Sequence, residues 1–297
     1  MRALLHFILR GQVSCGLLLA AASAIPLLVW LAAAGGSLLL LRRGLAASGP
    51  ALLLALLPTL AWWQVADEPR MALILLGSFA LAQVLRRYSS WVWVLLCSLL
   101  TGAASALCLK LAFSEPLAAQ NAQLQPFLPQ ALGTLYQQMS EAEQLRLSEL
   151  MPQLLLGVLA TLLQIASLIG LMLARYWQAL LFNPGGFARE FHALRLPKSV
   201  AFSLFALLLL MPALSATGAV LVPLCSLPLL FAGLALVHGK LAGKAGGKFG
   251  LVGLYLSLLL FMQLAYPLLV VLALADSLFD FRGLKTRKGH SASNPDI

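Results

Sequence analysis

Residues 152–174 read PQLLLGVLATLLQIASLIGLMLA and contain no charged side chain. A bilayer core of about 30 Å requires roughly 20 apolar residues in each spanning helix, so this stretch alone predicts a transmembrane helix. It belongs to a series of roughly seven or more apolar stretches that runs from Val13 to Ala275. The series predicts an all-α, polytopic transmembrane helical bundle of about eight membrane segments, within a range of about seven to ten.

The composition argues against a soluble globular domain. Of the 297 residues, 61% are hydrophobic and 10% are charged, whereas a soluble domain has about 25% charged residues. The formal net charge of +10 is carried by basic residues in the short breaks between apolar segments, which is the positive-inside signature of membrane topology. This placement favours contact with anionic lipid headgroups and argues against nucleic-acid binding.

The flanking charges predict how the chain is threaded. Between Arg10 and Arg42 the apolar run is interrupted by Pro26, which fits two short or partly re-entrant helices better than one long span, although one kinked helix stays open. The acidic turn at residues 67–69 suits the outer side, and the basic pair at residues 86–87 suits the cytoplasm. These assignments predict a multi-pass membrane protein with a cytoplasmic N-terminus.

The C-terminal part is predicted to return to the same side. The apolar block at residues 249–275 must cross twice, or dip and return, for the basic residues after it to be cytoplasmic. Residues 1–282 are therefore expected to form a single integral membrane domain. Residues 283–297 are polar, which predicts a disordered cytoplasmic tail.

One substantial stretch, residues 114–151, lies outside the apolar blocks and carries mainly acidic charges. Apolar residues recur at helical spacing over residues 124–139, and Ser140 followed by Glu143 is a capping-box pattern. The stretch is therefore predicted to be an external amphipathic helical hairpin whose second helix is short. Pro152 then suits the first turn of the following helix, which can run to about Phe182.

Residue patterns for catalysis or metal binding are missing from the sequence. The four histidines are scattered, the four cysteines lie inside apolar segments, and no nucleophile or zinc motif is present. The glycine- and lysine-rich break at residues 238–248 lacks the spacing of a phosphate-binding loop, so a flexible basic linker is predicted there. The sequence thus predicts neither an enzyme nor a bound cofactor or metal.

Three groups of polar residues remain as candidate sites. Glutamines inside apolar segments could line a polar cavity, although such residues more often hold helices together; they are Gln64, Gln83, Gln164 and Gln263. A helix-end ion pair is predicted among Asp276, Asp280 and Arg282. A partner-docking or cytoplasmic motif is predicted at Asn183, Pro184, Gly185, Gly186, Arg189 and Arg195, with a helix stop and a topology-setting basic loop as the alternative.

Three motifs in the C-terminal half carry a family resemblance. They are ARYWQA at residues 174–179 followed by NPGGF at 183–187 and REF at 189–191, then FAGLALVH at 231–238, and finally AD at 275–276 with FDFR at 279–282. With these motifs the chain resembles the YybS-like family of uncharacterised multi-span bacterial inner-membrane proteins. The resemblance implies an architecture similar to the substrate-binding subunits of energy-coupling-factor transporters, but this chain has more apparent spans and an extra outer hairpin.

Two functions are therefore expected as alternatives. The first is a small-molecule-binding transport module that needs partner subunits, which the architectural similarity implies. The second is an accessory or scaffolding membrane protein that assists or regulates a membrane complex through its cytoplasmic loops. In both cases the lipid bilayer and other membrane proteins are the expected partners.

Overall fold

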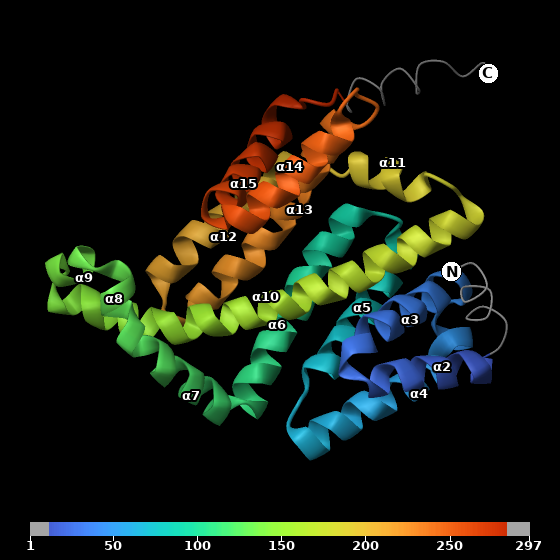
Figure 1. Cartoon of the computed structure of the whole chain (residues 1–297), viewed down its shortest axis with the longest axis horizontal. Coiled ribbons are helices and arrows are strands. Elements are labelled where there is room, and N and C mark those ends of the chain that lie inside the picture. The colour runs from blue at the N-terminus through green and yellow to red at the C-terminus, as the bar shows by residue number, and fades with distance from the viewer. Residues whose placement is uncertain (1–11, 284–297) are drawn as a thin grey trace. The chain divides into compact units, whose positions relative to one another are not determined.

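The computed structural model describes residues 12–283, and every regular element in this part of the chain is a helix (Figure 1). Seven helices are long and apolar enough to span a membrane: Pro26–Arg43, Leu45–Ala66, Arg70–Tyr88, Trp91–Ala112, Glu141–Phe182, Thr217–Leu241 and Met262–Phe279. Three shorter apolar helices accompany them: Val13–Ala24, Lys198–Leu214 and Gly247–Leu260. The predicted all-α, polytopic bundle is thereby confirmed.

The helices group into two compact units, where the sequence predicts one domain. Unit 1 comprises the described part of Met1–Pro184 together with Leu209–Leu224. Unit 2 comprises Gly185–Leu208 together with the described part of Cys225–Ile297. The tail predicted at residues 283–297 lies outside the described residues except for Gly283.

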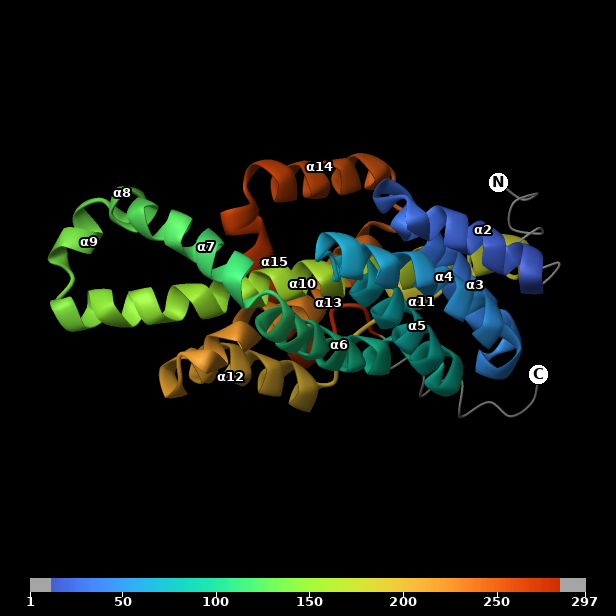
Figure 2. The ribbon, with the colours of Figure 1, turned by 90° about the horizontal axis from the view of Figure 1, so that it is seen from below.

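Unit 1 is built on one long helix, α10 (Glu141–Phe182), which packs against α3, α5 and α6 (Figures 1 and 2). The helices of this unit that precede it are α2 (Gln12–Ala24), η1 (Pro26–Leu28), α3 (Val29–Arg43), α4 (Leu45–Ala66), α5 (Arg70–Tyr88) and α6 (Trp91–Ala112). Because α2 and α3 are separate helices that contact each other, the alternative of one kinked helix around Pro26 is excluded.

Two neighbouring helices of unit 1 are joined by a cationic cap. Helix α3 ends at Gly44, whose φ of 80° is one that glycine adopts without steric cost. The guanidinium of Arg86, at the end of α5, donates hydrogen bonds to the last carbonyl groups of α3, at 2.7 Å for Leu41 and 3.4 Å for Leu40. A cation at a helix C-terminus is favourable because the helix dipole is negative there.

The core of unit 1 is held by small and hydroxyl side chains. Ser37 Oγ donates to the carbonyl of Ser78, and Ser78 Oγ donates to the carbonyl of Ser167, so that α3, α5 and α10 are linked in series. Gln164 Nε2 donates to Ser98 Oγ at 2.8 Å and links α10 to α6. Such bonds and close backbone approach drive helix association in lipid, where burial of apolar surface gives little gain.

The stretch from Ser114 onward, predicted to be external, is helical but has more breaks than expected. It consists of α7 (Ser114–Leu124), η2 (Gln125–Phe127), α8 (Leu128–Leu132) and α9 (Thr134–Gln138), which lie at the left of Figure 2 beside the start of α10. The prediction that the apolar residues at 124–139 form a stripe along one helix is wrong, because these residues are divided among several short helices. Pro126, Pro129 and Gly133 interrupt the helix, and none of these elements contains a buried residue.

The predicted helix boundary at Pro152 is also wrong. The capping box at Ser140 is present, with its side chain accepting from the Glu143 N–H and the Glu143 carboxylate accepting from Ser140. However, the helix that it begins continues through Pro152 to Phe182 instead of stopping. Proline removes one N–H from the ladder, and the packing of the same helix against three neighbours compensates for that loss.

Unit 2 contains α11 (Gly186–His192), α14 (Gly247–Leu260) and α15 (Met262–Phe279), whereas α12 (Lys198–Leu214) and α13 (Leu221–Leu241) contribute residues to both units. The predicted C-terminal block is therefore two helices, α14 and α15, which pack on each other and meet at Phe261. Helix α13 and helix α15 approach so closely that a Cβ at Gly233 would collide with the backbone of Leu269.

We expect Gly157→Ala to destabilise unit 1. A Cβ at Gly157 would lie 2.6 Å from the carbonyl oxygen of Val220 and 2.8 Å from Cγ of Pro223, so η3 (Thr217–Val220) would have to move. Overpacking of this kind costs about 1–3 kcal/mol. The measurement is the free energy of unfolding in mixed detergent micelles.

Gly49→Ala is the matched control, since nothing lies within 4 Å of a Cβ built there. This change should be neutral, or stabilising by up to about 1 kcal/mol, because alanine has the higher helix propensity. Equal free energies for the two variants would contradict the close packing of α10 on η3.

Candidate functional site

The first side of the candidate site is the short helix α11. It begins after Gly185, whose φ of 78° lies in the left-handed region that glycine tolerates. Phe191, on the buried face of α11, stacks edge-on against the His238 ring of α13, with 5.3 Å between ring centroids. His238 Nδ1 is 2.9 Å from the carbonyl oxygen of Leu234, and its Nε2 is 3.2 Å from the Tyr255 hydroxyl. The ring contact holds α11 on α13, and the two contacts of the His238 nitrogens fix the orientation of its ring.

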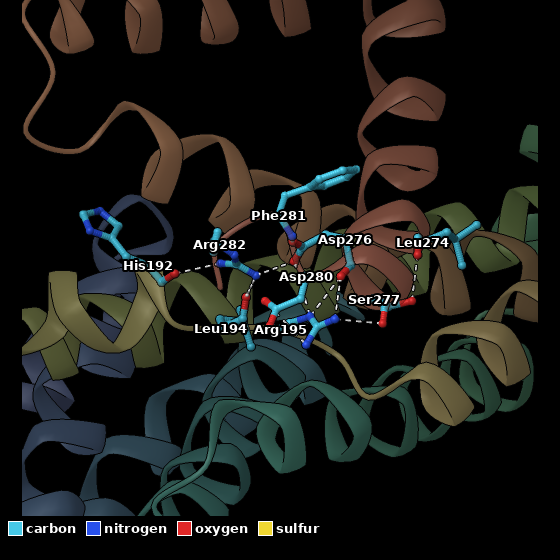
Figure 3. A network of polar contacts seen from close by, with 9 residues as sticks. All are labelled: His192, Leu194, Arg195, Leu274, Asp276, Ser277, Asp280, Phe281 and Arg282. Atoms are coloured by element: carbon cyan, nitrogen blue, oxygen red, sulfur yellow. Dashed lines mark hydrogen bonds and ion pairs between the residues drawn. The ribbon is translucent and has the colours of Figure 1, made fainter. Parts of the chain in front are cut away.

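The carboxylate of Asp276, at the end of α15, lies at the centre of a buried network (Figure 3). Its side chain is 3% exposed, and Oδ2 accepts from Arg282 Nη2 at 2.7 Å. Oδ1 accepts from the backbone N–H of Phe281 at 3.1 Å. Arg282 also donates to the carbonyl groups of His192 at 2.7 Å and Leu194 at 2.8 Å. Arg282 thus joins the end of α15 to the end of α11 and to the residues that follow it.

Arg195 completes the network from the other side. Its guanidinium donates to the carbonyl groups of Asp276 and Ser277, at 2.7 and 2.9 Å, which are among the last carbonyls of α15. It also lies 3.6 Å from the carboxylate of Asp280 and 3.8 Å from that of Asp276. Arg195 therefore acts as a C-terminal cap for α15. Two guanidinium groups are balanced by two carboxylates here.

A basic cleft of ≈ 640 Å³ lies within unit 2 beside this network. Five basic residues line it, and its lining includes neither aspartate nor glutamate: the lining residues are Arg189, His192, Ala193, Gly239, Lys240, Ala242, Lys244, Phe281 and Arg282. Gly239 permits the close approach of α13 to His192 and Arg282 on the opposite side of the cleft. A Cβ at this position would lie 3.1 Å from the His192 carbonyl oxygen and 3.3 Å from Arg282 Cδ.

Arg282 is the deepest of the basic residues in the cleft. Its side chain is 6% exposed, whereas Lys240 and Lys244 are exposed. The Nε–H of Arg282 is buried and has no hydrogen-bond partner among the described residues. A buried N–H without a partner is costly, so the position of Arg282 depends on the ion pair and hydrogen bonds made by the rest of its guanidinium.

Burial lowers the pKa of the His192 imidazole below its ordinary value of about 6.5. Electrostatic interactions with His238 and with the Arg282 guanidinium lower this pKa further. His192 is thus held toward its neutral form. An anion in the cleft would oppose this effect, because a nearby negative charge favours the imidazolium.

The residues predicted as a docking motif are divided between several places. Asn183 ends α10, and the boundary between the two units follows Pro184. Gly185 and Gly186 begin α11, and Arg189 is exposed and lines the cleft. Arg195 is 11% exposed and serves the internal network. A docking role for these six residues stays a prediction. Arg189 is the exposed basic residue among them.

The ion pair predicted at the end of the last helix is present between Asp276 and Arg282, with Asp280 held by Arg195 instead. The four glutamines have different surroundings. Gln164 is buried and Gln83 half-buried, each with a buried Oε1 that lacks a partner within residues 12–283, while Gln64 and Gln263 are exposed. The cleft that the structure shows is lined by other residues.

Sequence reasoning missed the cleft itself. It treated residues 238–248 as a linker, whereas His238, Gly239 and Lys240 belong to the last turns of α13. The signal was present as basic residues in three separate breaks, which positive-inside topology explains equally well. Only the fold brings these breaks together.

No family model, curated protein or solved structure matches this chain. The class of the protein therefore follows from its helices alone. It is a multi-pass helical membrane protein in contact with the lipid bilayer.

We expect Asp276→Asn to destabilise the protein strongly. The change leaves the guanidinium groups of Arg195 and Arg282 buried beside one carboxylate fewer, and loss of one partner of a buried pair costs about 3–5 kcal/mol. Glu68→Gln is the control, because it removes the ion pair of Glu68 with the exposed Arg70, worth about 0–1 kcal/mol. Unfolding in mixed micelles measures both. A small and equal effect of the two changes would contradict the network's role.

We expect the protein to lose stability as the pH falls through about 6.5. The unfolded chain binds a proton on His192 in that range, while the folded protein resists it because the pKa is lowered, so the unfolded state gains. In His192→Gln the fall in melting temperature between about pH 7.5 and 5.5 should be smaller. An unchanged fall in that variant would show that other groups cause it.

Proposed function

We propose that this chain is a bacterial inner-membrane module that binds a small anionic molecule in the basic cleft of unit 2 and works with partner subunits in transport. The observation that carries the proposal is the cleft of ≈ 640 Å³ with five basic lining residues and no acidic ones. Its size is in the range of small-molecule sites, which are concave and have a few convergent polar groups.

Topology alone accounts for only part of this arrangement. Positive-inside placement requires lysines and arginines in cytoplasmic breaks, but it does not require them to converge on a concave surface. It also gives no reason for them to share a lining that contains no carboxylate. A bound anion would explain both features, since it neutralises the converging charges.

The charge distribution supports a cytoplasmic position for the cleft. Lys240, Lys244 and Lys248 lie at the end of α13, between α13 and α14, and at the start of α14. The acidic turn at Asp67 and Glu68 lies in a break on the opposite side in the predicted threading. The resemblance of the C-terminal motifs to the YybS-like family is in accord with a bacterial inner membrane. Both termini would then be cytoplasmic.

The second candidate function is that of an accessory protein for a membrane complex. It is favoured by the external hairpin, which presents large apolar side chains to the outside although it lies beyond the apolar helices. Phe127 is 58% exposed and Leu135 is 63% exposed. Such side chains commonly take part in protein contacts.

The proposal predicts that charge reversal in the cleft abolishes retention of an anion. Protein purified in a mild neutral detergent from its own membranes should carry a small anionic molecule, detected by mass spectrometry together with co-purified proteins. In the double variant Lys240→Glu, Lys244→Glu we expect about a tenfold or greater loss of that molecule, because each charged hydrogen bond contributes about 1.5–3 kcal/mol.

Lys248→Glu is the matched control, because Lys248 is exposed, lies in the same region and does not line the cleft. It should keep the wild-type amount of the molecule. If wild type and both variants carry no anion but recover the same membrane complex, the accessory function replaces the transport proposal.

A further inference from the structure

The donors of the cleft indicate which anion it accepts. Lys240 and Lys244, in the last turn of α13 and just after it, each contribute an ammonium group to the lining, and Arg282 contributes its guanidinium from the segment after α15. The carboxylate of Asp276 is satisfied by two donors, Arg282 Nη2 and the Phe281 N–H. A lining with several separate donors suits an anion with more oxygens, such as phosphate.

The charge of the cleft leads to the same class of ligand. The charge of Arg282 is balanced by Asp276 at 2.7 Å, but Lys240 and Lys244 face a lining that contains no carboxylate. A phosphate monoester carries about two negative charges near pH 7 and a phosphodiester headgroup carries one, so the two ammonium groups attract either. Phosphate is also the group for which lysine commonly serves as a point charge and arginine as a donor fork.

The surroundings of the cleft bear on the source of the phosphate. Phe281 lines the cleft, and α14 begins three residues after Lys244 with apolar side chains that face outward. Phe249 is 83% exposed and Val252 is 56% exposed. An acyl chain attached to a bound headgroup would therefore meet apolar side chains. Basic pockets between membrane helices bind anionic lipid headgroups in this way.

We propose that the cleft lined by Lys240, Lys244 and Arg282 binds a phosphate group, carried either by an anionic phospholipid or by a soluble phosphate ester. This inference rests on the proposed function and names its ligand class. The lysines supply charge and hydrogen-bond donors, and Gly239 leaves the space in which α13 approaches His192 and Arg282.

The test uses the full-length protein in neutral detergent micelles with four probes. Native mass spectrometry compares adducts of dioleoyl phosphatidylglycerol with those of dioleoyl phosphatidylcholine, which has no net charge. Thermal unfolding compares inorganic phosphate with citrate, a carboxylate anion, at equal ionic strength. Each probe is applied to wild type, to the double variant Lys240→Gln, Lys244→Gln and to the control Lys248→Gln.

Two results support the proposal and identify the source. Preferential phosphatidylglycerol adducts that weaken about tenfold in the double variant, but not in Lys248→Gln, identify a lipid headgroup. Stabilisation by inorganic phosphate with the same dependence on the two lysines identifies a soluble phosphate. Competition in wild type, where inorganic phosphate displaces bound phosphatidylglycerol, provides the test if the double variant does not fold.

Two other results overturn it and are distinguishable from each other. If citrate alone depends on Lys240 and Lys244, the cleft binds anions as proposed but the ligand is not a phosphate. If none of the four probes distinguishes wild type from the double variant, and phosphate displaces nothing from wild type, both the phosphate inference and the proposed anion-binding function fail.

Discussion

The pairing of Asp276 with Arg282 is the interaction on which unit 2 depends. It lies at 2.7 Å with both side chains nearly inaccessible to solvent, where an unbalanced charge is strongly unfavourable. The same guanidinium then binds the carbonyl groups of His192 and Leu194, so one carboxylate fixes the chain segment that follows α11 against the end of α15. The pairing also shapes the cleft, because it holds Arg282 in the lining that Lys240 and Lys244 share.

Unit 1 is stabilised by a different kind of interaction. Its helices are apolar on nearly every face, and lipid is as good a solvent for leucine as another helix is. Specific packing therefore depends on positions where the backbones can approach closely. Gly157 faces the backbone of η3, and the serine bonds between α3, α5 and α10 cross the same tightly packed core. The long α10 can contain Pro152 because it has neighbours along most of its length.

Local signals predicted local structure well, and they did not predict which distant segments meet. The break at Pro26, the capping box at Ser140 and the pairing of Asp276 with Arg282 depend on residues close in sequence, and the structure contains all three. Arg195 lies 81 residues from Asp276, and no local pattern links them. The two wrong predictions have opposite causes. Over residues 124–139, the helical spacing of apolar residues predicts one helix, but two prolines and a glycine interrupt it. At Pro152, the proline predicts a helix start, but tertiary packing lets α10 continue through it.

The three lysines at the junction of α13 and α14 distinguish a role in topology from a role in binding. Positive-inside placement requires all of them equally, since it depends only on the side of the membrane on which a charge lies. The fold treats them differently: Lys240 and Lys244 line the cleft with Arg282, whereas Lys248 lies in the first turn of α14 outside it. A charge kept only for topology gains nothing from convergence, because neighbouring cations repel each other and the repulsion is relieved simply by spreading them apart. Their convergence on a lining without carboxylates is therefore the feature that topology leaves unexplained and that an anionic ligand would explain.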